Sequence, residues 1–247
     1  QGEYNGSVET PDGIKTYGGK VIALGDGKFR IVGYEGGLPG DGWSRGDGQT
    51  TVDAESKDGK ITAKSERADL VIGDGKIAVQ VNGQELGSLK KVERKSDTLG
   101  AKPPKGAVVL FDGSSAENFR DGKLVDGKWL GATNCESKKK LGDHHLHIEF
   151  RTPFMPKSSG QGRGNSGVYM QSRYELQVLD SFGLDGKNNE CGGIYSISEP
   201  IVNMCLPPLA WQTYDIDFTA AKYDADGKKI KNARATIKHN GFVIHDG

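Results

Sequence analysis

Asp-Gly and Asn-Gly pairs between short apolar runs constrain the fold of this chain more than any other feature. These dipeptides supply the positive φ angles that two-residue β-hairpin turns need. Glycine makes up 37 of the 247 residues, about twice the usual share of roughly 7%. No segment shows a sustained 3.6-residue apolar repeat, so the sequence predicts an all-β protein. The pairs that separate strand-like runs are Asp26-Gly27, Asp58-Gly59, Asp74-Gly75, Asn82-Gly83 and Asn240-Gly241.

A proline-containing segment divides the chain into two predicted domains. Residues 1–100 contain short strand-like runs at regular spacing, which indicates a small antiparallel β barrel or sandwich. The segment LGAKPPKGA (99–107) follows, and Pro103-Pro104 stiffens it into an extended connector. Residues 101–247 contain further strand-like runs, and we expect them to form an antiparallel β-sandwich.

The glycine-rich stretch GGLPGDGWSRGDG (36–48) invites comparison with a phosphate-binding loop. It lacks the Gly-Lys-Ser/Thr ending and any helical pattern after it. An ordinary exposed loop is therefore the better interpretation, with Trp43 expected to pack back on the barrel rather than stack on a ligand.

The charge pattern excludes several classes of partner. The chain carries 33 basic and 33 acidic residues, and neither half is polarised. Nothing in this pattern favours a nucleic acid or an anionic membrane surface. No apolar run approaches the length of a membrane span. Because the sequence starts at Gln1 rather than Met, we expect an exported protein, periplasmic or extracellular, whose signal has been removed.

The three cysteines, Cys135, Cys191 and Cys205, form no CxxC pair and have no zinc-ribbon spacing. A Cys191–Cys205 disulfide with one free thiol and three buried thiols are both compatible with the sequence. A catalytic cysteine is the weakest option, since no neighbouring pattern supports one.

Two predicted strands each carry a strongly polar face, since strand side chains alternate between faces. In DHHLHIEFRTP (143–153), polar and apolar residues alternate along the run. In GNSGVYMQSRYELQVLD (164–180) a second polar face follows, and a bulge near residue 178 would bring Asp180 to it. The first face presents His145, His147, Glu149 and Arg151, and the second presents Asn165, Tyr169, Gln171, Glu175 and Gln177. Antiparallel sheets commonly expose one face to water. These residue types, however, suit hydrogen bonding to sugars, and we expect both faces to line one cleft.

Several spaced blocks resemble the 3-keto-disaccharide hydrolase family over residues 106–247. They are LFDG (110–113), DHHLHIEFRTP, GNSGVYMQSRYELQVLDSFG, CGGIY (191–195), Pro207-Pro208 followed by WQTYDI (211–216), and KNARATIKHNGFVIHD. The resemblance implies a concanavalin A-like jelly-roll β-sandwich with its site on the concave sheet. It also implies action on glycosides already oxidised at C3 of the sugar. The first 100 residues look like an accessory β domain attached to some exported relatives.

The chemistry implied by the family needs a base for the C2 proton, an acid for the leaving oxygen, and a group that stabilises the C3 oxyanion. The acid/base candidates are Glu149, Glu175 and His147. Arg151 is the candidate for the oxyanion. The same three acid/base residues could instead hold a divalent metal ion, the only cofactor that the sequence suggests. The residues expected to bind substrate are Arg151, Asn165, Tyr169, Gln171, Gln177, Asp180 and Trp211.

Two other functions remain open from the sequence. ELQVLD (175–180) is similar to the ExDxxE signature of laminarinase-like glucanases, which are retaining glycosidases with the same sandwich. Here Gln177 replaces the middle Asp and Asp180 replaces the last Glu. A non-catalytic carbohydrate-binding or scaffold module is the other alternative. Family members usually continue past the Asn-Gly hairpin, so we expect either a fragment or a second polypeptide that completes the sandwich.

Overall fold

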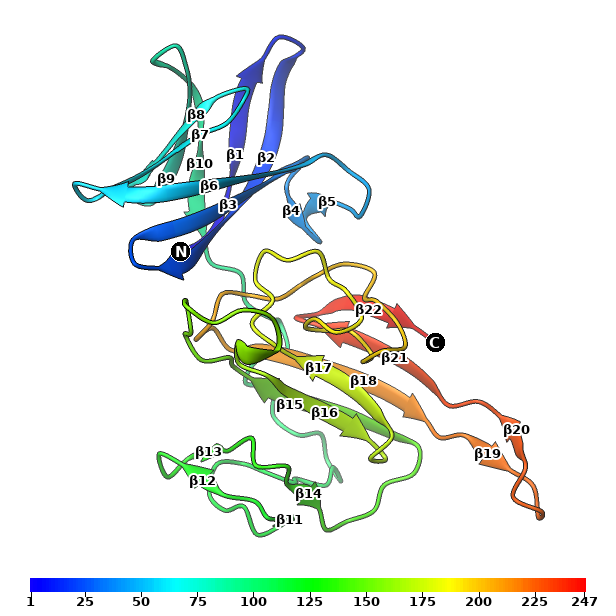
Figure 1. Ribbon diagram of the computed structural model, residues 1–247. Helices are drawn as coiled ribbons and strands as arrows, with labels where there is room; N and C mark the ends of the chain where they lie inside the picture. The colour runs from blue at the N-terminus through cyan, green and yellow to red at the C-terminus, as the bar shows by residue number, and fades with distance from the viewer.

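The computed structural model describes all 247 residues and is built almost entirely of β-strands. Figure 1 shows a barrel at one end, a sandwich in the middle, and small hairpins at the other end. The one helical element is a 3₁₀ turn, Gly160–Gly162. The all-β prediction is therefore confirmed. The structure has no helix with the length and apolarity that crossing a membrane requires.

The N-terminal domain is a closed barrel of eight antiparallel strands, in the order β1-β10-β9-β8-β7-β6-β3-β2. Its turns are those that the Asp-Gly and Asn-Gly pairs predict, because both central residues have positive φ, as at Asp26 (51°) and Gly27 (73°). The strands are β1 (Gly2–Thr10), β2 (Gly13–Gly25), β3 (Lys28–Glu35), β6 (Gln49–Lys57), β7 (Lys60–Lys64), β8 (Asp69–Gly73), β9 (Lys76–Val81) and β10 (Gln84–Val92).

Strands β2 and β3 carry apolar side chains on both faces, and this explains how the barrel packs against the second domain. Val21 and Ile31 are paired across the two strands and belong to the barrel core. Their neighbours Ile22 and Val32 belong instead to the core of the second domain. One face of the β2–β3 hairpin thus fills the barrel, and the other buries apolar surface against the sandwich.

The second domain is a sandwich of two unequal sheets. The larger has the order β15-β18-β21-β22, and the smaller is the hairpin β16–β17. Its core joins both sheets, with Leu176 and Met170 from the hairpin against Tyr214 and Ile216 from the larger sheet. The strands are β15 (His144–Phe150), β16 (Ser166–Met170), β17 (Tyr174–Val178), β18 (Gln212–Thr219), β21 (Arg234–His239) and β22 (Phe242–Asp246).

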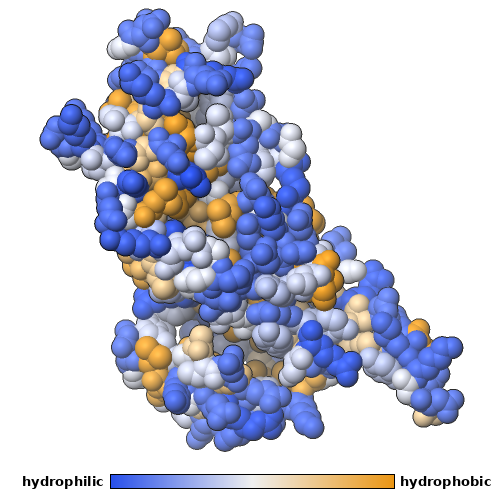
Figure 2. All heavy atoms as spheres, in the orientation of Figure 1, coloured by the Kyte–Doolittle hydropathy of each residue, from blue (hydrophilic) through white to orange (hydrophobic).

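Short paired strands complete the structure outside the two domains' main sheets. They are β4 (Leu38–Pro39), β5 (Gly42–Trp43), β11 (Phe119–Arg120), β12 (Leu124–Val125), β13 (Trp129–Leu130), β14 (Glu136–Ser137), β19 (Lys222–Tyr223) and β20 (Lys229–Lys231). The hairpin β19–β20 projects from the sandwich in Figure 1. In the same orientation, Figure 2 shows a mainly hydrophilic surface with a hollow between the sandwich and the region of β11–β14.

Candidate functional site

The first predicted polar face lies on the outside of the larger sheet. Strand β15 pairs with β18 in a register that places His147 opposite Asp215 and Glu149 opposite Thr213. His147 Nδ1 lies 2.7 Å from Asp215 Oδ1, and its Nε2 lies 3.4 Å from Glu149 Oε1. Leu146 and the other apolar residues of β15 pack into the core, as the alternation predicts.

Residues 96–100, which follow β10 and are called here the interdomain segment, cross this face and form hydrogen bonds with its polar groups. Thr98 Oγ1 donates to Asp215 Oδ2 at 2.8 Å, and the backbone N–H of Gly100 donates to Glu149 Oε1. Ser96 Oγ lies 2.6 Å from Thr213 Oγ1 and is buried. The carboxylates of this face therefore hold the interdomain segment in place.

Arg151 lies further along the same face, in contact with two tryptophans. Its guanidinium carbon is 5.4 Å from the ring centroids of both Trp129 and Trp211. The two indole rings are 4.7 Å apart. Arg151 is thus held by cation–π contacts on the outside of the larger sheet.

The second predicted polar face lies on the outside of hairpin β16–β17. Tyr169 is opposite Glu175 in the register, and its hydroxyl donates to Glu175 Oε2 at 2.7 Å. This hydrogen bond to a carboxylate raises the pKa of Tyr169. A Cβ atom at Gly167 would overlap the Glu175 side chain, so glycine at this position leaves room for the carboxylate.

Two amide side chains continue this face beside Glu175. Gln177 is buried, and its Nε2 donates to Asn165 Oδ1 at 2.8 Å and to the carbonyl of Ser166 at 3.0 Å. The exposed residue Tyr195 borders the same strand, because its backbone N–H donates to the Glu175 carbonyl at 2.9 Å. A half-buried carboxylate, two phenols and the Asn165 amide thus share one surface, and the buried Gln177 amide lies beneath it.

The two faces do not meet, because the core of the sandwich separates them. Tyr214 points from β18 across the core, and its hydroxyl donates to the backbone carbonyl of Gln177 at 2.7 Å. Its neighbours in β18, Thr213 and Asp215, point the other way, toward the interdomain segment. The prediction that both faces line one cleft is therefore wrong, since the strands belong to different sheets packed through their apolar sides.

The same separation bears on the predicted metal ligands. Glu175 lies across the core from His147 and Glu149, so these three residues cannot share an ion. No group of three or more His, Cys, Asp or Glu side chains in the structure is arranged to hold a metal ion. His147, Glu149 and Glu175 therefore do not form together the divalent-ion site that the sequence suggested.

Asp180 and Gln171 occupy other places than the strand alternation indicates. Strand β17 ends at Val178, and Asp180 is buried in an ion pair with Arg163 Nε at 2.7 Å. Gln171 lies in the turn between β16 and β17 with a φ of 54°. The predicted bulge does not return Asp180 to the exposed face, because the chain turns inward where the strand ends.

All three cysteines are free thiols, and two of them lie in the core. Cys191 Sγ lies 3.2 Å from Tyr214 Oη. A hydrogen bond with Cys191 and burial raise the pKa of Cys205. Buried thiols with such partners pack the core and have no exposed reactive face.

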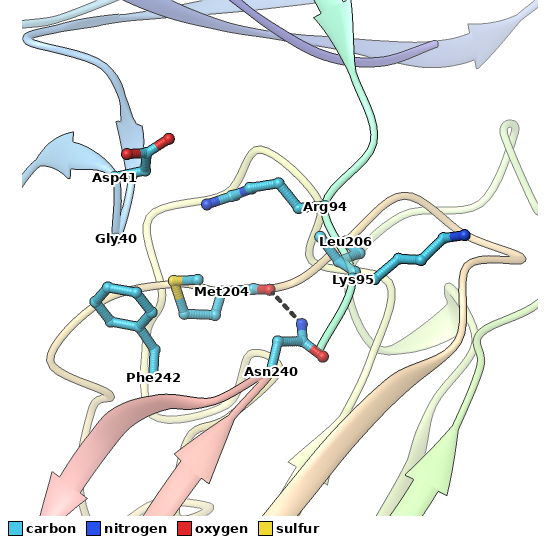
Figure 3. Close-up of a pocket in the computed structure, with 8 residues that line it drawn as sticks. All are labelled: Gly40, Asp41, Arg94, Lys95, Met204, Leu206, Asn240 and Phe242. Atoms are coloured by element: carbon cyan, nitrogen blue, oxygen red, sulfur yellow. Dashed lines mark hydrogen bonds between the residues drawn. The ribbon is translucent and has the colours of Figure 1, made fainter. Parts of the chain in front are cut away.

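Two cavities of the structure are lined by none of the predicted site residues. One of about 330 Å³ lies where the barrel meets the sandwich and is lined by Asp41, Arg94, Met204, Asn240 and Phe242, among others (Figure 3). Its polar groups are largely occupied, since Asn240 Nδ2 donates to the Met204 carbonyl and Arg94 binds Glu3. This cavity belongs to the interdomain contact.

The fold and the polar faces together define a two-domain all-β protein whose sandwich carries sugar-binding types of side chain. The sequence profile of the 3-keto-alpha-glucoside-1,2-lyase-like domain matches residues 106–247. The chain therefore belongs to this family, and its sandwich is of the concanavalin-like type. No curated protein matches the chain.

A solved structure supports the same relationship. A crystal structure from Parabacteroides distasonis ATCC 8503, described as that of a candidate glycosyl hydrolase, is similar to this chain with 31% sequence identity and a TM-score of 0.53. The similarity covers 57% of this chain and 65% of that chain, which is less than two thirds of the relative's length.

Sequence reasoning missed several residues of these faces. Asp215 and Thr213 could have been found by applying the two-residue alternation to WQTYDIDF, where Tyr214, Ile216 and Phe218 form the apolar set that faces the core. Trp129 gives no such signal, because its contact with Arg151 depends on how β13 lies against the sandwich.

Proposed function

We propose that this chain belongs to an enzyme that cleaves glycosidic bonds of sugars oxidised at C3, by C2 proton removal and loss of the C1 substituent. The family and the description of the Parabacteroides distasonis structure support a carbohydrate-active enzyme. The observation that carries the proposal is the Tyr169–Glu175 pair, which lies within the matched residues beside two amide side chains.

In this proposal Glu175 is the base. Its Oε2 accepts the Tyr169 hydrogen bond, which leaves Oε1 to take the C2 proton. The ketone at C3 makes this proton acidic, because the electron pair of the broken C2–H bond delocalises onto the C3 oxygen. Breakage of the C1–O bond then expels the aglycone oxygen, which takes up a proton from water, and Glu175 returns the proton it removed to the solvent. Addition of water to the unsaturated product completes a net hydrolysis.

The side-chain amide of Asn165 can stabilise the negative charge that develops on the C3 oxygen. Asn165 uses its Oδ1 to accept from Gln177, so the Nδ2 of Asn165 points its donors elsewhere and can hydrogen bond to the C3 oxygen or to sugar hydroxyls. Exposed Tyr195 would lie against the sugar ring. We propose that Asn165, Tyr169 and Glu175 form the site together and that the buried Gln177 side chain orients Asn165.

The other predicted residues receive a different role in this proposal. His147 and Glu149 anchor the interdomain segment, as their contacts with Asp215 and Gly100 indicate. Arg151 and Trp211 lie on that same outer face. A laminarinase-like reaction would need a second carboxylate beside Glu175, and Asp180 is instead buried against Arg163.

The test compares a chromogenic 3-keto-glucoside with the same glucoside left unoxidised, both in D₂O. The proposal predicts release of the aglycone from the keto sugar alone, with deuterium at C2 of the product. Cleavage of the unoxidised glucoside without deuterium at C2 would contradict it. Binding of both sugars without turnover would favour the carbohydrate-binding alternative.

A further inference from the structure

The connection between β17 and β18 is long and depends on outside support. Residues 179–211, called here the 179–211 loop, contain no strand and only isolated bridges at Ile194. Loops of this length without regular hydrogen bonding are uncommon unless other elements hold them. Most of this loop's residues around Cys191 and Met204 are nevertheless buried.

The loop forms one wall of the site proposed above. Its middle part adds to the edge of β17, where the Gly192 N–H donates to the Gln177 carbonyl and the Gln177 N–H donates to the Gly193 carbonyl. Tyr195 N–H donates to the Glu175 carbonyl two residues further on. The position of Glu175 and Gln177 therefore depends on the conformation of residues 191–195.

A single side chain from the barrel ties together the two ends of this middle part. Arg45, from the turn after β5, places Nη2 3.2 Å and 2.9 Å from the carbonyl oxygens of Asp185 and Gly186. The same nitrogen is 3.0 Å from the carbonyl of Pro200, on the returning side of the loop. One guanidinium thus brackets residues 187–199 from both sides.

The barrel also contacts the loop through apolar surface. Ile22 and Trp43 of the barrel share a core with Phe182 and Met204 of the loop. A Cβ atom at Gly183 would come within 2.6 Å of Ile22 Cδ1, so the loop lies directly on β2. The φ of 80° at residue 183 also favours glycine there.

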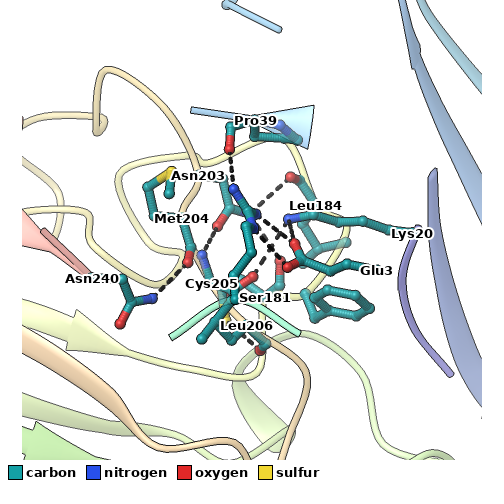
Figure 4. A network of polar contacts seen from close by, with 12 residues as sticks. Glu3, Lys20, Pro39, Ser181, Leu184, Asn203, Met204, Cys205, Leu206 and Asn240 are labelled. Atoms are coloured by element: carbon teal, nitrogen blue, oxygen red, sulfur yellow. Dashed lines mark hydrogen bonds and ion pairs between the residues drawn. The ribbon is translucent and has the colours of Figure 1, made fainter. Parts of the chain in front are cut away.

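A buried ion pair completes the contact. Figure 4 shows Lys20 reaching from the barrel to the carbonyl of Cys205, at 3.4 Å, beside Glu3. Lys20 and Glu3 are 1% and 2% exposed and lie 3.5 Å apart, and Arg94 binds both carboxylate oxygens of Glu3. Charges buried this deeply need fixed partners, so the contact has one defined geometry.

From these contacts we propose that the N-terminal barrel is a brace for the 179–211 loop and that Arg45 is its positioning residue for the site. Arg45 touches no reacting group. It fixes the two ends of residues 187–199, and through them the backbone edge that carries Glu175, Gln177 and Tyr195. The effect on turnover rests on the proposed function, whereas the effect on the loop does not.

Hydrogen exchange on the full chain tests the brace without any substrate. Arg45→Met should accelerate exchange of the Gln177, Gly192 and Tyr195 amides by about tenfold or more, because the loop opens locally. Amides of β3 in the barrel should keep their rates. Arg45→Lys should fall between the wild type and Arg45→Met, because Nη2 alone makes the three carbonyl contacts and an ammonium keeps three donors on a shorter side chain.

The matched control is Arg30→Met, which removes an exposed ion pair with Asp53 between two strands of the barrel. It should leave the loop amides unchanged. Loop exchange that stays at the wild-type rate in Arg45→Met, or that rises equally in both domains, would overturn the brace.

Activity gives the second readout. If the wild type cleaves the 3-keto-glucoside, Arg45→Met should lower kcat/KM about tenfold while Arg30→Met keeps it. An unchanged kcat/KM would remove Arg45 from the positioning role. If the wild type does not cleave the keto sugar, the proposed function fails, and the exchange result still decides the brace.

Discussion

The hydroxyl of Tyr169 donates a 2.7 Å hydrogen bond to Glu175 across the outer face of hairpin β16–β17. Tyr169 is 58% exposed, so this bond serves the surface rather than the core. Tyr169→Phe should therefore change the free energy of unfolding by no more than about 0.5 kcal/mol. It should lower kcat on a 3-keto-glucoside roughly 10-fold to 100-fold, because the carboxylate loses its orienting donor. Urea unfolding and steady-state kinetics check both values, and an unchanged kcat would count against the pair.

The interdomain segment is held by side-chain hydroxyls. Thr98 Oγ1 bonds to Asp215 and lies 3.2 Å from Thr213 Oγ1. Thr98→Val keeps the shape and removes these bonds, so it should cost about 1–2 kcal/mol of unfolding free energy. The control Thr51→Val changes an exposed threonine in β6 and should cost less than about 0.5 kcal/mol. Equal losses in urea unfolding for the two variants would show that the contact adds nothing.

The buried Glu3–Lys20 pair predicts that a single substitution lowers the free energy of unfolding more than the double substitution does. Burial lowers the pKa of Lys20, and Glu3 opposes this effect. Glu3→Gln leaves the ammonium buried without its counter-charge and should cost roughly 3–5 kcal/mol. Adding Lys20→Met removes that charge and should recover part of the loss. A double variant that is less stable than Glu3→Gln, measured by urea unfolding, would contradict this account.

His239 makes the protein sensitive to acid. It is fully buried, with Nε2 3.0 Å from Gln212 Oε1, and burial lowers its pKa from 6.5 to about 3. Below pH 6.5 the unfolded chain binds a proton at this histidine that the folded chain does not. Stability should therefore be fully present above pH 6.5 and fall toward pH 3, by at most about 1.4 kcal/mol per pH unit from this group.

The variant His239→Gln keeps a side-chain donor and removes the titration. Its urea midpoint should change less between pH 7 and pH 4 than that of the wild type. His145→Gln is the control, because His145 lies on the exposed face beside Asp217. The same acid dependence in all three proteins would contradict a role for His239.

The hairpin turns and the alternation along strands were predictable because they depend on residues near one another in sequence. The Asp-Gly turns and the two polar faces follow from such local rules. The alternation says which side chains share a face of one strand. It does not say which sheet the strand joins, so it could not show that Glu149 and Glu175 lie on opposite sides of the core.

Other features depend on contacts between distant segments. Arg45 lies in a stretch that reads as an exposed loop, yet it binds carbonyls about 140 residues away at Asp185 and Gly186. Backbone carbonyls leave no mark in the sequence, because every residue has one. Asp180 carries a carboxylate of the kind found in active sites, but it is buried in an ion pair with Arg163.

The measurement that tests the account most directly is kcat on a 3-keto-glucoside for Glu175→Gln and Glu149→Gln side by side. Both changes remove one carboxylate and keep its size. The account predicts that Glu175→Gln loses about 10²-fold to 10⁴-fold in kcat, because the base is gone. It predicts that Glu149→Gln keeps its kcat and loses only stability, because Glu149 holds the Gly100 N–H. Full activity in Glu175→Gln with loss of turnover in Glu149→Gln would contradict the account and place the site on the opposite face.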